Sequence, residues 1–163
     1  MSGLWYLDWK VSTSSAQSGY STIKDEEGNI ICNKARLVTQ GYSQMEGVDY
    51  DETFAPISRM ESIRILLALA CHLRFKLYQM DVKTAFLNGL LKEDVYVAQP
   101  KGFIDPHFPD YVLYLKKAFY RLKQAPRAWY DRLTQYLVSH GFIKGKVYQT
   151  LFIKKEDGEL IIA

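Results

Sequence analysis

Apolar residues recur with two different periods along the chain, and these periods predict its strands and helices. Period-two alternation and short runs of β-branched and aromatic residues predict strands at 21–24, 30–38, 76–82, 95–98, 112–115, 150–154 and 160–163. Apolar residues at helical spacing predict a helix over 59–74, which we expect to pack on the sheet. A second helix is predicted to start at Pro126 and to end at Gly141. Because these elements do not repeat as strand–helix–strand units, we predict an α+β fold with a mainly antiparallel sheet.

Polar and glycine-containing segments separate these elements. Residues 25–29 and 156–159 have the composition of hairpin turns, so each is expected to join the strands on either side of it. The small polar tract at 12–15 and the segment 41–54 are predicted to be loops. The first 18 residues show no clear pattern and are left unassigned.

The length and composition of the chain predict one globular domain. The chain has 163 residues, of which 48% are hydrophobic and 14% aromatic, enough to bury one core. The two cysteines, Cys32 and Cys71, have no spacing typical of a disulfide framework or a zinc site. The longest apolar run, 65–70, is too short to span a membrane, and the start of the chain does not resemble a signal peptide. We therefore expect an intracellular protein without a membrane partner.

The positive charge is unevenly distributed. Residues 116–132 hold six basic residues and one acidic residue, Asp131, whereas the remaining residues hold 15 basic and 17 acidic ones. This segment also carries aromatic residues such as Trp129 and Tyr130, a mixture that suits nucleic-acid contacts. The alternative is a core aromatic stripe with a solvated basic face. The expected nucleic-acid contacts are Lys116, Lys117, Lys123 and Arg127.

Gln124 lies in the same segment, just before the predicted helix that starts at Pro126. Its amide is expected to lie beside the free N–H groups of the helix N-terminus, which attract anions.

Asp81 is the strongest candidate for chemistry. It follows a predicted strand and precedes a turn, so its carboxylate is expected to be rigidly held and open, as a Mg²⁺ ligand must be. The carbonyl of Val82 is a candidate second oxygen ligand, and Phe86 is close enough in sequence to line a small pocket. The alternative is a solvated aspartate that begins a turn.

Lys34 and Arg36 share one face of a predicted hairpin strand. Two cations side by side suit a triphosphate, because a guanidinium group matches phosphate oxygens. The alternative is an ordinary charged outer face.

Together these segments resemble the reverse transcriptase domain of copia-type retrotransposon Pol polyproteins. The segments that carry the resemblance are KARLV (34–38), GVDY (47–50), TFAP (53–56), QMDVKTAFLNG (79–89), QPKGF (99–103), LKQAPRAWY (122–130) and TLFIKK (150–155). They occur in the family's order over residues 21–163.

The resemblance implies a right-hand polymerase, with fingers over about 19–75 and a palm over about 76–163, and leaves 1–18 unassigned. It implies two Mg²⁺ ions, a template–primer of RNA and DNA, and deoxynucleoside triphosphates as substrates. The matching positions are Asp81 as the first metal-binding aspartate, Val82 with its carbonyl as a metal ligand, Phe86 as the gate against ribose, Gln124 beside the incoming nucleotide, and Arg36 and Lys34 on the triphosphate.

The chain departs from the family pattern in three respects. The two further catalytic aspartates would follow Ala163, so we expect this chain alone not to polymerise DNA. Arg121 and Arg74 stand where the family commonly has glycine. If Arg121 takes a positive φ angle, the side chain costs about 1–2 kcal/mol there.

The predicted function is therefore an incomplete RNA-directed DNA polymerase domain. Two alternatives stay open: a non-catalytic nucleic-acid-binding remnant of the same element, and an interaction module that uses an exposed sheet edge.

Overall fold

The computed structural model describes residues 4–7 and 14–163, and it describes side chains from Thr22 onward except those of 34–37. The elements are β1 (Leu4–Leu7), β2 (Ser14–Lys24), β3 (Ile30–Thr39), η1 (Gly41–Ser43), α1 (Met60–Leu73), η2 (Ala85–Asn88), β4 (Leu90–Ala98), β5 (Val112–Lys117), α2 (Ala125–Ser139), β6 (Ile143–Lys144), β7 (Phe152–Glu156) and β8 (Glu159–Ile162). One sheet has the order β1-β5-β4-β2-β3 and the other has the order β6-β7-β8. All strand pairs are antiparallel except β2 with β4, which agrees with the predicted α+β class.

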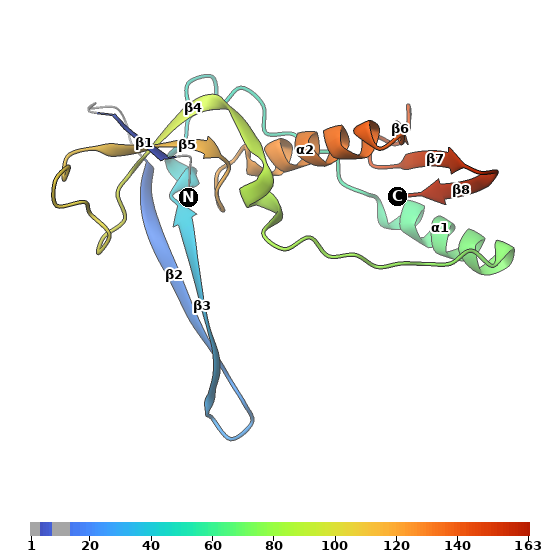
Figure 1. Cartoon of the computed structure of the whole chain (residues 1–163), viewed down its shortest axis with the longest axis horizontal. Coiled ribbons are helices and arrows are strands. Elements are labelled where there is room, and N and C mark those ends of the chain that lie inside the picture. The colour runs from blue at the N-terminus through green and yellow to red at the C-terminus, as the bar shows by residue number, and fades with distance from the viewer. Residues whose placement is uncertain (1–3, 8–13) are drawn as a thin grey trace.

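The core lies between β4, β5 and α2 (Figure 1). Its buried residues are Val95, Val97, Leu115, Ala118, Leu122, Ala125 and Ala128. Small residues on α2 allow the helix to approach closely. A Cβ atom on Gly89 would lie 2.8 Å from the backbone of Ala128, so glycine is required where the chain passes the helix.

Strands β2 and β3 form a long hairpin that projects away from this core (Figure 1). The predicted turn at 25–29 is confirmed: Asn29 donates its backbone N–H to the Asp25 carboxylate at 2.6 Å, and Gly28 has a φ of 89°.

The prediction of a loop at 12–15 is wrong for Ser14 and Ser15, which pair with Val97 and Ala98 of β4. Ser12 and Thr13 lie outside the described residues. The unassigned segment 1–18 also contributes β1, which pairs with β5. These long-range pairings leave no periodic signal in a stretch of serines.

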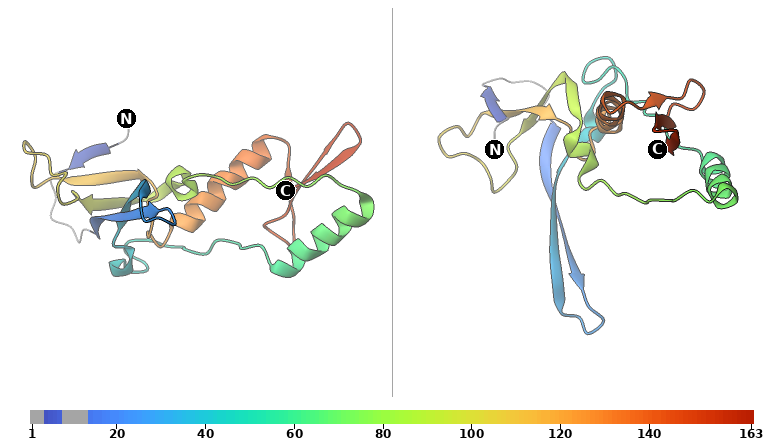
Figure 2. Two further views of the ribbon diagram at one scale, coloured as in Figure 1. Left: turned by 90° about the horizontal axis from the view of Figure 1, so that it is seen from below. Right: turned by 45° about the vertical axis from the view of Figure 1, so that its right-hand side comes forward.

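Helix α1 forms where it was predicted, but it does not pack on the sheet. Arg59 is its N-cap, Arg74 ends it in the left-handed region, and Ala70 is its one buried residue. Figure 2 shows α1 at the far end of the molecule from β1 and β5. Helical spacing predicted the element correctly, but it carries no information about the surface that the helix contacts.

The predicted strand at 76–82 is not formed. Tyr78, Met80 and Val82, the expected core face, are 77%, 86% and 48% exposed. Figure 1 shows this segment as an extended connection between α1 and η2. A strand needs a neighbour for its backbone N–H and C=O groups, and within the described residues the segment is in no strand pair.

The remaining predicted strands and the second helix are present, with bounds that differ from the predicted ones by up to five residues. Strand β4 begins at Leu90 and has an irregular register before Val95, and α2 ends before Gly141, whose φ is 85°. The C-terminal hairpin turns at Asp157 and Gly158 as expected, and the short strand β6 was not predicted. No helix in the described part of the chain is long and apolar enough to cross a membrane.

Candidate active site

Asp81 is exposed on the extended segment that leads into η2. The chain turns directly after it at Thr84, which has a φ of 54° and whose carbonyl accepts hydrogen bonds from Leu87 N and Asn88 Nδ2. The turn and the open carboxylate expected from the sequence are therefore both present, although the strand that was expected to hold Asp81 is not.

The oxygen donors at this place are few. The described residues contain no group of three or more His, Cys, Asp or Glu side chains placed to hold a metal ion. A two-ion site of the polymerase type holds its ions about 3.5–4 Å apart with several shared oxygens. The Asp81 carboxylate and the Val82 carbonyl do not fit such a pair of ions by themselves.

Phe86 is fixed on the ordered side of this turn. It is half-buried, packs against the core cluster, and meets the ring of Tyr120 edge-on with centroids 5.9 Å apart. The ring position is therefore set by the segment 118–124, which also carries Gln124.

Gln124 is at the N-cap of α2 but does not cap it with its side chain. The side chain is 2% exposed and turns into the protein. Its Oε1 accepts a hydrogen bond from Gln44 Nε2 at 3.1 Å, and its Nε2 lies 3.5 Å from the carbonyl of Asp49. In this structure the amide is held by the loop 44–49 and is closed to solvent.

Gln44 was not identified from the sequence, yet it connects three parts of the site. Besides Gln124, its side-chain Oε1 accepts from Lys123 N at 3.0 Å, and its backbone carbonyl accepts from Lys123 Nζ at 2.8 Å. Gln44 is 5% exposed. Its buried side-chain amide is hydrogen-bonded to other groups of the protein, as buried polar groups usually are. Its position in a polar, non-periodic loop gave no signal of burial.

The base of the β2–β3 hairpin is attached to the same segment. Thr39 donates both its backbone N–H and its hydroxyl to the carbonyl of Tyr120, at 3.1 and 3.0 Å. A Cβ atom on Gly41 would lie 1.8 Å from the carbonyl oxygen of Arg121, so only glycine fits this approach. Residues 39–44 therefore dock closely on 120–124 and link the hairpin to the start of α2.

Both arginines that replace a common family glycine have positive φ angles. Arg121 has a φ of 70° and Arg74 a φ of 57°. The condition under which Arg121 is strained is therefore met, and the same left-handed conformation at Arg74 ends α1.

The basic residues expected to contact phosphate groups lie in different environments. Lys116 and Lys117 are exposed at the end of β5. Lys123 also lies 5.3 Å from the centre of the Tyr50 ring. The backbones of Lys34 and Arg36 are in β3, but their side chains lie outside the described part of the structure.

Arg127 is in an ion-pair network with three other side chains. It pairs with Glu52 at 3.3 Å and with Asp131 at 3.2 Å, and Asp131 also pairs with Lys92 at 2.7 Å. Burial by itself raises the pKa of Asp131, but the hydrogen bond from Lys92 and the charge of Arg127 together bring that pKa below its usual value. Arg127 is therefore compensated within the chain, and also donates to the carbonyl of Phe54 at 3.1 Å.

Comparison with known proteins identifies relatives over most of the chain. A family model described as reverse transcriptase (RNA-dependent DNA polymerase) matches residues 16–163. The chain is 45% identical over 137 residues to the retrovirus-related Pol polyprotein from transposon RE1 of Arabidopsis thaliana, which covers 84% of this chain and 9% of that protein. It is 44% identical over 121 residues to the corresponding polyprotein from transposon TNT 1-94 of Nicotiana tabacum, covering 74% of this chain and 9% of the relative. No solved structure matches the chain.

Proposed function

The chain belongs to the reverse transcriptase family of copia-type Pol polyproteins, and from this we propose that it is the part of an RNA-directed DNA polymerase that binds template–primer and nucleotide. The observation that carries the proposal is the family match over residues 16–163, which includes every candidate site residue. The chain spans 9% of the length of the polyproteins it matches, so their full activity comes to it only as part of this proposal. Fingers over 19–75 and a palm over 76–163 are the division that we propose.

Each candidate residue takes a distinct role in this proposal. The exposed Asp81 carboxylate would hold a metal ion together with the Val82 carbonyl, and Phe86 would stand against the ribose 2′ position. The edge-on contact with Tyr120 supports Phe86 in that role, since a steric gate must not yield. Lys34 and Arg36 would neutralise the triphosphate from β3.

Gln124 reaches a nucleotide only after its bond with Gln44 opens, because both amides are buried against each other. We therefore propose that the loop 44–49 moves when a nucleotide binds. Each hydrogen bond that holds this loop on residues 123–124 involves a side chain. Such a bond typically contributes about 0.5–1.5 kcal/mol, so nucleotide binding can supply the free energy needed to break these bonds.

Catalysis needs more carboxylates than the described residues bring together. We propose that the 163 residues alone bind nucleic acid but do not polymerise DNA. The exposed pair Lys116 and Lys117 favours this binding function even in the absence of catalysis.

Fluorescence anisotropy of a labelled RNA–DNA template–primer tests this proposal with the purified chain. We expect binding at low salt that weakens steadily as salt rises, because each phosphate contact releases counterions. Changing both Lys116 and Lys117 to Gln is expected to make the slope of the logarithm of the binding constant against the logarithm of the salt concentration shallower, by about 0.9 per lost contact. No binding at low salt, or binding that salt does not affect, contradicts the proposal.

A further inference from the structure

The backbone of Arg121 is held in a conformation that disfavours arginine. Its φ of 70° lies in the left-handed region, where a side chain crowds the carbonyl oxygen that follows it. The surrounding packing imposes this conformation, because the carbonyl of Arg121 approaches Gly41 so closely that a Cβ atom on Gly41 would not fit. Arginine therefore occupies a position whose backbone favours glycine, and strain of this kind is a reason to look for a function of the side chain.

The fold itself makes little use of the Arg121 side chain. The residue is exposed, and in the described part of the chain it belongs to none of the ion pairs or cation–π contacts. Arg127, six residues later, differs in this respect, since it pairs with Glu52 and Asp131 at 3.3 and 3.2 Å. Among the described residues, the charge of Arg121 is therefore uncompensated and is available to a ligand.

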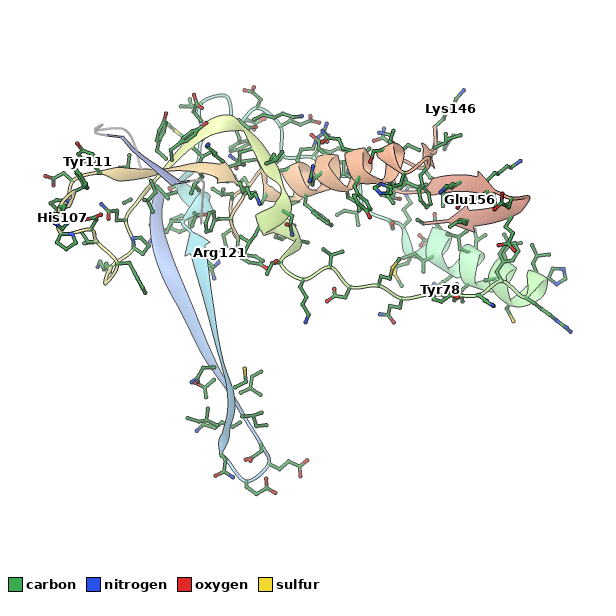
Figure 3. The ribbon with its side chains drawn as sticks, viewed as in Figure 1. Tyr78, His107, Tyr111, Arg121, Lys146 and Glu156 are labelled. Atoms are coloured by element: carbon green, nitrogen blue, oxygen red, sulfur yellow. The ribbon has the colours of Figure 1, made fainter. Side chains whose placement is uncertain are left out.

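Arg121 lies where several parts of the candidate site meet. The residue before it, Tyr120, accepts two hydrogen bonds from Thr39 through its carbonyl and contacts the ring of Phe86 edge-on. Gln124 follows three residues later at the N-cap of α2. Figure 3 shows Arg121 between the base of the β2–β3 hairpin and η2. The position is therefore adjacent to the residues expected to face a nucleotide.

Strand β3 brings another candidate cation to the same place. Val38 forms a parallel bridge with Tyr120, and Arg36 is two residues earlier on the same strand. Two strand residues span about 6.6 Å, so the backbones of Arg36 and Arg121 are close enough for their side chains to contact neighbouring phosphate groups of one ligand. A guanidinium group suits such a ligand, because its paired N–H donors match two phosphate oxygens.

We propose that Arg121 is a phosphate contact of the candidate site and adds a cation to the pair Lys34 and Arg36. This inference rests on the proposed function and adds a binding residue to it. The phosphate comes either from the triphosphate of the nucleotide or from the backbone of the template–primer. The neighbouring Phe86 and Gln124 favour the triphosphate, since both are placed beside the nucleotide in the proposed function.

The test compares two glycine variants with the same change in charge and in backbone strain. Arg121→Gly removes the proposed contact. Arg74→Gly is the matched control, because Arg74 is also exposed, also has a positive φ and lies at the end of α1. Both variants are expected to raise the urea midpoint, which shows that each keeps the fold. Arg121→Lys is a third variant, which keeps the charge but not the paired donors.

Two ligands distinguish the two sources of phosphate. Binding of a fluorescent deoxyadenosine triphosphate analogue is measured with Mg²⁺, and binding of a labelled RNA–DNA template–primer is measured as salt is raised. Arg121→Gly is expected to weaken triphosphate binding by at least about tenfold, because a hydrogen-bonded charge pair is lost. Arg121→Lys is expected to fall between Arg121→Gly and the unchanged chain. Arg74→Gly is expected to stay within about twofold of the unchanged chain, because only long-range attraction is lost.

The other outcomes either reassign the phosphate or overturn the inference. Weakening of template–primer binding alone, with a slope of log binding constant against log salt that is shallower by about 0.9, supports a contact with the nucleic-acid backbone. No weakening by Arg121→Gly for either ligand, or equal weakening by Arg121→Gly and Arg74→Gly, overturns the inference and leaves the proposed function intact. Failure of the unchanged chain to bind either ligand overturns both.

Discussion

The segment from η2 to α2 and the segment from α1 to Asp81 are both rich in apolar residues, but they differ in burial. In the first, Val97, Leu115 and Leu122 are 2–3% exposed within one cluster. In the second, Ile65, Leu67 and Met80 are 67%, 47% and 86% exposed. Apolar periodicity therefore predicts the form of an element, and its stability depends on whether another element covers the apolar face.

The candidate site lies across these two regions. Phe86 and Gln124 are attached to the buried cluster through Tyr120 and Gln44, whereas Asp81 is on the exposed segment. We infer that Phe86 is held in place by the buried cluster, that Gln124 is held closed by Gln44, and that Asp81 gains its final position only when further contacts form around it. The predictions below test this difference between the two regions.

The largest difference is expected between two leucine-to-alanine changes. Leu115→Ala should lower the free energy of unfolding by about 2–5 kcal/mol, because it removes apolar contacts and leaves a cavity. Leu67→Ala in α1 should change it by less than about 0.5 kcal/mol, because Leu67 is 47% exposed and alanine has the higher helix propensity. Urea unfolding followed by circular dichroism measures both, and equal effects would show that α1 is buried in solution.

A second prediction concerns the buried amide pair. Gln44→Ala should cost about 1–3 kcal/mol, because it leaves Gln124 Oε1 buried without its donor. Gln79→Ala, an exposed glutamine on the other region, is the matched control and should be nearly neutral. A double-mutant cycle with Gln124→Ala should give a coupling of about 0.5–3 kcal/mol, and a coupling near zero would contradict the contact.

Replacing either of the two arginines that have a left-handed backbone conformation by glycine should stabilise the protein. Arg121→Gly removes about 1–2 kcal/mol of steric strain but adds about 0.5–1 kcal/mol of chain entropy in the unfolded state. The expected gain is about 0.5–1 kcal/mol, and Arg74→Gly should behave similarly because its φ is also positive. Urea midpoints of the two single variants measure the gains, and destabilisation by Arg121→Gly would contradict the strain.

The smallest effect should be the pH dependence from Asp131. Its pKa is lower in the folded state, so its contribution to stability is complete above the ordinary pKa of 3.8 and is lost as the pH falls through the folded value. The ion pairs involved are partly exposed, so we expect the loss to be a few tenths of a kcal/mol. Asp131→Asn should remove this part of the acid dependence in urea titrations between about pH 7 and pH 3, and an unchanged profile would contradict it.

Local rules predicted much of the fold. The two hairpin turns, the bounds of α1 to within one residue and the end of α2 just before Gly141 followed from turn composition, capping and apolar spacing. The errors share one cause, since the strand at 76–82 and the packing of α1 both required a partner surface. Whether an element has such a partner depends on residues far away in the sequence, so the alternation of Tyr78, Met80 and Val82 does not reveal it.

The sequence proposes candidate site residues, but it does not predict the contacts that those residues make. Resemblance identified Asp81, Phe86 and Gln124, and their roles stay predictions. The burial of Gln124 by Gln44 depends on two positions 80 residues apart, joined by polar atoms that leave no hydrophobic pattern.

Primer extension by the purified chain is the most direct test of the central claim. The substrate is an RNA template annealed to a labelled DNA primer, with deoxynucleoside triphosphates and Mg²⁺, and binding is measured in the same solution. We predict that the chain binds the template–primer and leaves the primer unextended. Magnesium-dependent extension that Asp81→Asn abolishes would contradict the account, because the described residues would then suffice for catalysis.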